Sequence, residues 1–256
     1  MLLPFGWLRK DNGADLPATP PEDEQDLVVL MDPSLDPKLV VYQEPRSYPA
    51  EQYRTFRTNM RAMNPGDAPR TLLFTSTSPD EGKSTTVANI ALCLSEFQHL
   101  KVCLIDMDLR QPRMHEFFGL PPGPGVTDVL LDRVNPRKVL QPGSSPNLSV
   151  ITAGRPTNKP SEVTASEYVP DFLGYLKQQF NYILVDTPPV GLFGDASELG
   201  KAVDGVILVV AIGQTLKRNA DEALAILDSA GANVVGSFVT RARTAEPTIV
   251  PDLEEV

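Results

Sequence analysis

A short loop in the first half of the chain carries side chains that suit phosphate binding. It reads Thr77-Ser-Pro-Asp-Glu-Gly-Lys-Ser84 and lies between an apolar run and an apolar-periodic helical pattern that begins at Thr85. In a strand, loop and helix of this kind, backbone N–H groups surround the phosphate oxygens, and Gly82 lets the chain pass close to them. Lys83 then neutralises charge on the β- and γ-phosphates, and the Ser84 hydroxyl is placed to bind Mg²⁺. These residues predict a nucleotide-binding P-loop.

The loop departs from the common GxxxxGK[ST] pattern at its first position, which is Thr77. A capped helix after a turn is the alternative interpretation of such a segment. We favour the P-loop, because Gly-Lys-Ser directly between a buried strand and a helix is much rarer than the same tripeptide elsewhere. The predicted nucleotide-binding residues are Ser78, Pro79, Asp80, Glu81, Gly82, Lys83, Ser84 and Thr85.

Two further apolar runs end in carboxylates. Asp106, Asp108 and Arg110 follow one run at alternate positions, and Asp186 follows another. Alternate residues share a face if the strand geometry continues, and the carboxyl ends of parallel strands meet at the edge where α/β sheets bind ligands. An aspartate after four apolar residues also occurs as a simple strand end. With a P-loop upstream in the same sheet, we interpret Asp186 as a Walker B acid that binds Mg²⁺ directly or through water.

The elements that must position these residues alternate along the chain. Apolar runs over 71–75, 102–105, 148–152, 182–185, 206–211 and 234–240 predict strands, and helical patterns lie over 49–63, after 82, near 127, over 169–180 and over 216–230. Short buried strands separated by helices indicate a parallel sheet covered on both faces. The predicted fold is therefore α/β, with three layers and a doubly wound, mostly parallel sheet.

Both ends of the chain differ from this central part. Residues 1–45 are rich in Pro, Asp and Glu and have one apolar patch at 27–31, so we predict a flexible, acidic N-terminal arm. Residues 46–243 form the predicted P-loop domain. Residues 244–256 are polar and acidic and contain no tyrosine, which predicts a loose C-terminal tail.

The composition excludes several classes of protein. The chain has 256 residues, of which 41% are hydrophobic and 22% charged, as in ordinary globular proteins. A net charge of −10 opposes binding to polyanions, so we expect no nucleic acid partner. Cys93 and Cys103 lie in apolar segments without a Cys/His cluster, which predicts buried, reduced thiols. The sequence contains neither an apolar run of the ~18 residues that cross a bilayer nor a signal peptide, so we expect a cytoplasmic protein.

Three signatures in a fixed order give the chain a resemblance to a known family. The signatures are the P-loop with Pro79 and Gly82, the Asp-x-Asp-x-Arg stretch 106–110 and the Asp-x-Pro-Pro stretch 186–189; residues 154–162 and Asp195 also match. In this combination, over about residues 46–243, the sequence resembles the bacterial tyrosine kinases (BY-kinases) that regulate capsule and exopolysaccharide synthesis, whose fold belongs to the MinD/ParA-like group of P-loop NTPases.

The resemblance implies a set of roles. The cofactors are ATP and Mg²⁺, and the substrates are protein tyrosines. Lys83 and the loop amides hold ATP, and Asp106 or Asp108 orients or deprotonates the tyrosine hydroxyl. Positioning and charge neutralisation do most of the catalysis. The implied catalytic residues are Lys83, Asp106, Asp108 and Arg110, and the implied metal ligands are Ser84, Asp106 and Asp186.

A charged helix face is the candidate subunit contact. Glu51, Arg54 and Arg57 recur at every third position, so one face of a helix carries all three. A solvated helix face is the alternative interpretation. Because the stretch is similar to the self-association helix of the family, we favour a contact within a homo-oligomeric ring.

The sequence departs from the family in three respects. The family typically phosphorylates a tyrosine cluster on its own C-terminal tail, whereas the last tyrosine here is Tyr182, which leaves Tyr42 and Tyr48 as flexible candidates. Thr240 stands near the end of the last predicted strand, where the family often has an asparagine facing the base. The family's membrane-spanning activator is absent from this sequence. We therefore expect the activator on a separate polypeptide, which recruits this chain to the inner face of the membrane.

Two other functions remain as alternatives. In a MinD/ParA-type positioning ATPase, an additional lysine usually stands where this chain has Ser78, and the surface or tail binds DNA or membrane; the acidic charge here opposes both. In an ATP-driven assembly switch, the nucleotide site persists without kinase output, and the missing tyrosine tail favours this alternative. The full set of Lys83, Asp106, Asp108 and Asp186 favours an active kinase.

Overall fold

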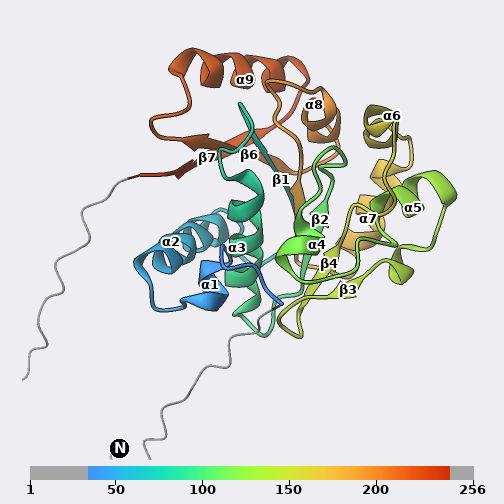
Figure 1. Cartoon of the computed structure of the whole chain (residues 1–256), viewed down its shortest axis with the longest axis horizontal. Helices are drawn as coiled ribbons and strands as arrows, with labels where there is room; N and C mark the ends of the chain where they lie inside the picture. The colour runs from blue at the N-terminus through green and yellow to red at the C-terminus, as the bar shows by residue number, and fades with distance from the viewer. Residues whose placement is uncertain (1–33, 243–256) are drawn as a thin grey trace, which may run out of the picture. The chain divides into compact units, whose positions relative to one another are not determined.

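A sheet of seven strands forms the centre of the computed structural model, which describes residues 34–242 (Figure 1). The strand order is β3-β4-β2-β5-β1-β6-β7, and every neighbouring pair is parallel except β3 with β4. The strands are β1 (Arg70–Ser76), β2 (Val102–Asp106), β3 (Gln141–Pro142), β4 (Leu148–Ile151), β5 (Tyr182–Asp186), β6 (Gly205–Ala211) and β7 (Val234–Thr240).

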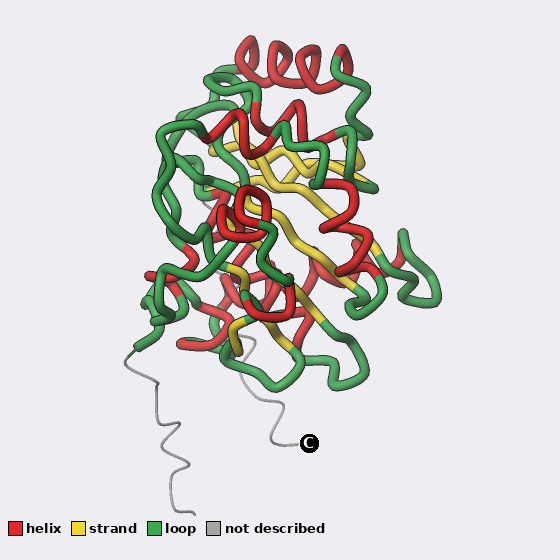
Figure 2. Tube along the Cα trace, turned by 90° about the vertical axis from the view of Figure 1, so that its right-hand side faces the viewer, coloured by secondary structure: helices red, strands yellow, loops and turns green. Residues whose placement is uncertain are grey.

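Helices cover both faces of the sheet, as the second view also shows (Figure 2). One apolar core lies between the sheet and α1, α2, α3 and α4, and the other lies between the sheet and α5 to α9. The predicted three-layer α/β fold with a mostly parallel sheet is confirmed. The helices are α1 (Val40–Gln43), α2 (Tyr48–Ala62), α3 (Lys83–Ser95), α4 (Met114–Phe117), α5 (Val126–Asp132), α6 (Pro160–Thr164), α7 (Val169–Lys177), α8 (Asp195–Gly200) and α9 (Lys217–Ser229).

The register of the central strands brings the predicted acids together. Asp106 at the end of β2 pairs with Asp186 at the end of β5, and Asp186 also pairs with Phe74 of β1. Beyond its last residue, Ser76, β1 continues into the P-loop and then into α3. The carboxyl ends of three adjacent strands therefore surround the start of one helix.

Helix α3 is the most deeply buried helix of the domain. All of its residues except Lys83 and Thr85 are buried, because α3 packs between the sheet and α2. Cys93 on this helix and Cys103 on β2 are free and buried, as predicted, and burial raises the pKa of the Cys93 thiol to about 12. The outer helix α2 begins at Ser47, whose hydroxyl accepts the N–H of Ala50, a cap that contributes about 1 kcal/mol.

The N-terminal boundary differs from the prediction. Residues 34–45 were expected in a flexible arm, yet Leu35, Leu39 and Val41 are buried against α3 and α4, and Val40–Gln43 form α1. The sequence pattern misses this, because three isolated apolar residues form no periodic face and are stabilised only by residues distant in the chain. The remainder of the predicted arm, 1–33, and the predicted tail lie outside the described residues. Within residues 34–242, no helix combines the length and the apolar composition needed to cross a membrane.

Candidate nucleotide-binding and catalytic site

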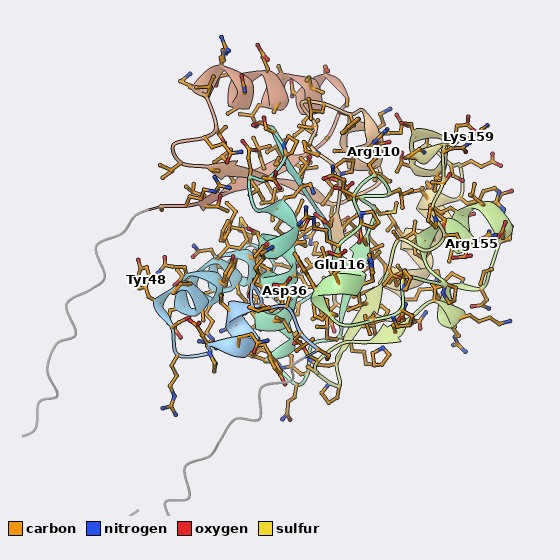
Figure 3. All side chains as sticks on the ribbon, in the orientation of Figure 1. Asp36, Tyr48, Arg110, Glu116, Arg155 and Lys159 are labelled. Atoms are coloured by element: carbon orange, nitrogen blue, oxygen red, sulfur yellow. The ribbon has the colours of Figure 1, made fainter. Side chains whose placement is uncertain are left out.

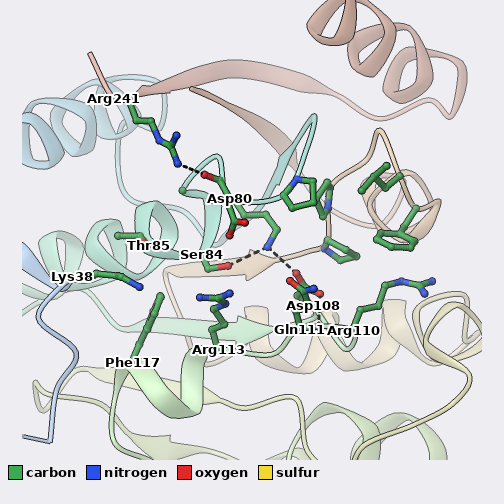
Figure 4. A pocket seen from close by; sticks show the side chains of 17 residues that line it. Lys38, Asp80, Ser84, Thr85, Asp108, Arg110, Gln111, Arg113, Phe117 and Arg241 are labelled. Atoms are coloured by element: carbon green, nitrogen blue, oxygen red, sulfur yellow. Dashed lines mark hydrogen bonds and ion pairs between the residues drawn. The ribbon is translucent and has the colours of Figure 1, made fainter. Parts of the chain in front are cut away.

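A cavity of about 480 Å³ lies at the edge where the central strands end. Six of the eight predicted P-loop residues line it, and Figure 4 shows Asp80, Ser84 and Thr85 among them. Ser78 and Glu81 are the two predicted loop residues that do not line the cavity. The lining residues of the loop and of the two acidic motifs are Pro79, Asp80, Gly82, Lys83, Ser84, Thr85, Asp108, Arg110, Gln111, Arg113, Pro188 and Pro189.

Backbone geometry explains the glycine of the loop. Gly82 has φ +89° and directly precedes the first turn of α3, in the left-handed region that favours glycine. A Cβ at this position would lie 3.3 Å from Cγ2 of Thr240, so the space is also restricted. Residues 82–85 all line the cavity, so the N-terminus of α3 lies at its wall, which suits an anionic ligand.

Glu81 holds the loop from behind. Its side chain is 1% exposed, and its Oε2 accepts the backbone N–H groups of Thr77 at 2.8 Å and Ser78 at 3.1 Å. Its Oε1 accepts the hydroxyls of Thr77 and Thr215. The Glu81 carboxylate therefore fixes the loop to the segment after β6, and the nucleotide-binding role predicted for this residue becomes a positioning role.

Lys83 points into a group of carboxylates. Its Nζ lies 2.7 Å from Oδ2 of Asp108 and 3.2 Å from Oγ of Ser84. Burial acts to lower the pKa of Lys83, but the charges of Asp186 and Asp108 outweigh it and raise the pKa. Lys83 is therefore charged at neutral pH, as a phosphate-binding lysine must be.

Asp106 is fully buried and organises the chain after β2. Its oxygens accept the N–H groups of Asp108 at 3.2 Å, Arg113 at 2.9 Å and Met114 at 2.9 Å. Burial, followed by the charge of Asp186, raises the pKa of Asp106. This acid thus shapes the loop that carries Asp108 and Arg110, in addition to any contact with a metal ion.

Asp186 is equally buried, but neither of its carboxylate oxygens has a hydrogen-bond partner among residues 34–242. Burial raises its pKa, and the charge of Lys83 opposes part of that shift. An unpaired buried carboxylate is costly, and a divalent cation relieves that cost. Asp186 and Asp106, directly paired in register and close to the P-loop serine, fit the oxygen ligands that Mg²⁺ takes alongside phosphates and water.

The described residues hold no cluster of three or more His, Cys, Asp or Glu side chains arranged as a metal site. Asp106, Asp186 and Ser84 supply two carboxylates and one hydroxyl, a donor set that fits a cation completed by phosphate oxygens and water.

Arg110 lies at the mouth of the cavity and is held in place. Its Nε donates to Asp195 at 2.8 Å, a further nitrogen donates to Ser161 at 2.8 Å, and its guanidinium lies 4.0 Å from the ring centre of Phe193. Asp195 is buried and also accepts the hydroxyl of Thr164. Arg110 thus presents its charge from a rigid support built by α6 and α8.

Several cavity residues were not predicted from the sequence. Arg113 lies three residues after Arg110, and Gln111 lies between them, so the continuation of the second motif was the available signal. Leu192 and Phe193 extend the Pro-Pro loop. The others, which the sequence pattern does not mark, are Lys38, Phe117 and Arg241.

The end of β7 closes onto the loop. The Thr240 hydroxyl donates to the carbonyl of Glu81 at 2.7 Å, and a guanidinium nitrogen of Arg241 donates to the carbonyl of Asp80 at 2.7 Å. Thr240, noted above as replacing a common asparagine, therefore acts on the P-loop in this structure.

The predicted subunit-contact residues are paired within the chain. The Nε of Arg54 donates to Oε1 of Glu96 at 2.9 Å, and its Nη1 donates to Oε1 of Glu51 at 2.5 Å. Arg57 also pairs with Glu96, and its guanidinium lies 4.5 Å from the ring centre of Phe97. The arginines thus join α2 to the end of α3, and the subunit contact remains a prediction.

Fold and site together define a class of protein. A left-handed glycine before a buried helix, a charged lysine among carboxylates and an unpaired acid at the end of the neighbouring strand are the parts of a P-loop nucleotide-binding site. The fold resembles that of the septum site-determining protein MinD from Pyrococcus horikoshii, solved with Mg-ADP, at a TM-score of 0.59 over 70% of this chain and 72% of that one, with 22% identity.

Comparison with known proteins identifies the family. No family model matches the chain. It is 34% identical over 201 residues to the tyrosine-protein kinase YwqD of Bacillus subtilis, spanning 78% of this chain and 84% of that one. It is 30% identical over 203 residues to the putative tyrosine-protein kinase CapB of Staphylococcus aureus, spanning 79% of this chain and 89% of CapB. The kinase domain of the Escherichia coli tyrosine kinase ETK has a TM-score of 0.75 and 28% identity, over 83% of this chain and 84% of that domain. The chain belongs to the bacterial tyrosine kinases.

Proposed function

We propose that the protein transfers the γ-phosphoryl group of Mg·ATP to tyrosine hydroxyls of protein substrates and regulates exopolysaccharide or capsule synthesis and export. The observation that carries this proposal is the convergence of Lys83 and Asp108, which line the cavity, with the buried, register-paired acids Asp106 and Asp186, whose charges act on Lys83.

Nucleotide binding rests on the loop and on α3. The N–H groups at the start of α3 and the turn at Gly82 face the phosphates, and Lys83 exchanges its contact with Asp108 for phosphate oxygens. Asp186, Asp106 and Ser84 are the residues that would hold Mg²⁺. When bound, the cation neutralises phosphate charge and orients the transferred group.

Proton transfer falls to Asp108. Its Oδ2 becomes free when Lys83 turns to the phosphates, while its Oδ1 continues to accept the N–H of Gln111 at 3.1 Å. The phenol oxygen attacks the γ-phosphorus, its proton passes to Asp108 Oδ2, and the bond from the γ-phosphorus to the bridging oxygen breaks to release ADP. Arg110, fixed by Asp195, stabilises negative charge at the cavity mouth.

The acceptor tyrosine comes from another molecule in this proposal. Tyr42 and Tyr48, the predicted flexible candidates, lie in α1 and α2 and are only partly exposed, so the expected flexible setting is wrong for both. In Figure 3, Tyr48 lies at the outer end of α2, on the opposite side of the molecule from Arg110. Tyr182 is buried, with its hydroxyl bonded to Asp67 and Asn64.

The proposal extends to partners. The structures similar to this chain include the chimerical protein CapA2B2, at a TM-score of 0.75 and 28% identity, over 81% of this chain and 91% of that one. In the proposal, the activator is a membrane-spanning protein on a separate polypeptide, which recruits the kinase to the inner face of the membrane. Glu51, Arg54 and Arg57 take part in a ring of identical subunits.

The test is incubation of the full chain with Mg·ATP labelled on the γ-phosphate, with and without a candidate activator segment, followed by phosphotyrosine mapping and measurement of free phosphate. We expect label on tyrosine in the wild type and none in Lys83→Met, which removes one charge from the first turn of α3 and leaves the fold intact. Free phosphate without labelled protein in every condition would instead support the ATP-driven assembly switch.

A further inference from the structure

The cavity has a wall that the P-loop motifs do not describe. Lys38 and Phe117 line it on the side of Thr85, across the cavity from Asp108 and Arg110 (Figure 4). Lys38 comes from the segment before α1, and Phe117 comes from α4. Two elements distant in sequence thus complete the cavity around the first turn of α3.

The segment that carries Lys38 is fixed by a buried side chain. Asn89 on α3 is fully buried, and its amide nitrogen donates to the carbonyls of Lys38 and Thr85, at 2.9 Å in both cases. Its amide oxygen accepts the N–H of Val41 at 3.0 Å. One asparagine therefore joins the backbone of Lys38 to the backbone of a P-loop residue.

Contacts with α4 fix the other side of the segment. The N–H of Asp36 donates to the carbonyl of Phe117 at 3.0 Å, and the N–H of Lys38 donates to Oδ1 of Asp36 at 2.7 Å. Leu35 and Leu39 are buried on either side. The position of the Lys38 backbone is therefore determined by packing and hydrogen bonds together.

The charge of Lys38 is available for a ligand. Five cations line the cavity, although the chain as a whole has a net charge of −10. Lys83, Arg110 and Arg241 already bond to protein oxygens. Within residues 34–242, the Lys38 ammonium forms no ion pair and lies 6.0 Å from the ring centre of Phe117, which orients it along the cavity wall.

We propose that Lys38 is a nucleotide-binding residue whose ammonium binds the α- or β-phosphate beside Thr85, on the opposite side of the phosphate chain from Asp108. This inference rests on the proposed function, since it assumes that the cavity holds a nucleotide. It extends the P-loop site to a cation supplied by the segment before α1. In this arrangement the γ-phosphate lies near Asp108, and the Lys38 ammonium does not contact it.

The test compares Mg·ADP and the non-hydrolysable Mg·AMPPNP by calorimetric titration of the full chain. A charge-assisted hydrogen bond predicts that Lys38→Met weakens both nucleotides equally, by about 5- to 30-fold. Lys38→Arg retains affinity within about threefold. Lys101→Met is the matched control. Lys101 is also exposed, but it precedes β2, at the opposite end of that strand from the cavity. The nucleotide affinity of Lys101→Met should therefore stay at the wild-type value.

Unchanged affinity of Lys38→Met for both nucleotides, with normal binding by Lys101→Met, would overturn the assignment of Lys38 and leave the proposed function standing. If Lys38→Met weakened the binding of AMPPNP alone, the placement of the Lys38 ammonium beside Thr85 would be overturned. If the wild type bound neither nucleotide, the proposed function would fail and this inference with it.

A second variant tests how Lys38 is positioned. In an Asn89→Ala background, shown to be folded by its thermal transition, Lys38→Met should weaken Mg·ADP less than twofold, because the backbone of Lys38 is no longer joined to Thr85. If Lys38→Met still weakened Mg·ADP binding by about 5- to 30-fold in that background, the positioning role of Asn89 would be overturned.

Discussion

Lys83 and Asp108 form an ion pair inside the cavity, with Nζ 2.7 Å from Oδ2. The side chains are 13% and 3% exposed, so water screens the pair weakly. The proposed phosphate-binding lysine and the proposed proton acceptor are thus each other's partner in this structure. In the proposed mechanism, a nucleotide separates them before it binds fully.

Replacing Asp108 with Asn is therefore expected to change binding and catalysis in opposite directions. Mg·ADP should bind about 3- to 10-fold more tightly, because Lys83 no longer has a competing carboxylate, an effect of about 1 kcal/mol. Phosphoryl transfer should fall by about 100-fold or more, because the proton acceptor is lost. Titration calorimetry and labelled-phosphate transfer measure the two effects. Weaker ADP binding would show that Asp108 supports the ligand rather than competes with it.

Glu81 provides a second test, directed at the support of the loop. Glu81→Ala leaves the N–H groups of Thr77 and Ser78 without an acceptor in a buried place, which is expected to lower the free energy of unfolding by about 2–4 kcal/mol. The same variant should bind Mg·ADP more than tenfold less tightly. Glu81→Gln keeps one acceptor oxygen and should recover most of the affinity. Nucleotide binding by Glu81→Ala at wild-type strength, measured on folded protein, contradicts the positioning role.

Asp186 links metal binding to stability. Burial raises the pKa of Asp186, so the folded state keeps the carboxyl proton at pH values where the unfolded state has released it. The free energy of unfolding therefore falls as pH rises from about 4 toward the raised pKa. Asp186→Asn removes this pH-dependent loss of stability. Without ligand, the variant should be more stable than the wild type at pH 8, by about 1–3 kcal/mol, with a smaller difference at pH 4.

The measurement for Asp186 is urea unfolding at both pH values, combined with nucleotide titration with and without Mg²⁺. The variant should lose the gain in nucleotide affinity that Mg²⁺ gives the wild type. A variant that is less stable at pH 8, yet responds normally to Mg²⁺, would contradict both the unpaired state of this carboxylate and its role as a ligand.

The parts of the site that were predictable from sequence are those encoded locally. Gly82, Lys83 and Ser84 are adjacent in the chain, and Asp106 and Asp186 each end an apolar run, so a parallel sheet suffices to bring them to one edge. The alternation of apolar runs and helical patterns likewise predicts the two helical layers and every strand except the two-residue β3.

The parts that were not predictable depend on contacts between distant residues. Asn89 lies 51 residues from Lys38, and Glu96 lies 42 residues from Arg54, so no spacing rule connects either pair. The inward turn of Glu81 depends in part on the hydroxyl of Thr215, which lies 134 residues away, although the groups of Thr77 and Ser78 that it also binds are local. A helix-face pattern also cannot tell whether Arg54 and Arg57 pair within the chain or between chains.

Variants of α2 and α3 distinguish pairing of these arginines within the chain from a contact between subunits. Arg54→Ala combined with Arg57→Ala is expected to shift any oligomer toward monomer in sedimentation velocity. Glu96→Gln is the matched control, because it breaks the pairing within the chain and leaves both arginines available to a neighbour. An equal shift in both variants would indicate that the arginines act only by holding α2 against α3.

Glu96 finally gives a dependence of stability on pH. Burial acts to raise its pKa, but hydrogen bonds from Arg54 and Arg57 outweigh it and lower the pKa. A lowered pKa in the folded state contributes stability above the unfolded value of about 4.3, and this contribution is lost as pH falls through the folded value. Because Glu96 is about one-third exposed, we expect Glu96→Gln to lower the free energy of unfolding by only about 0.5–1 kcal/mol at pH 7. The difference should disappear near pH 3, as urea unfolding can measure; a difference that persists there would assign the effect to packing rather than charge.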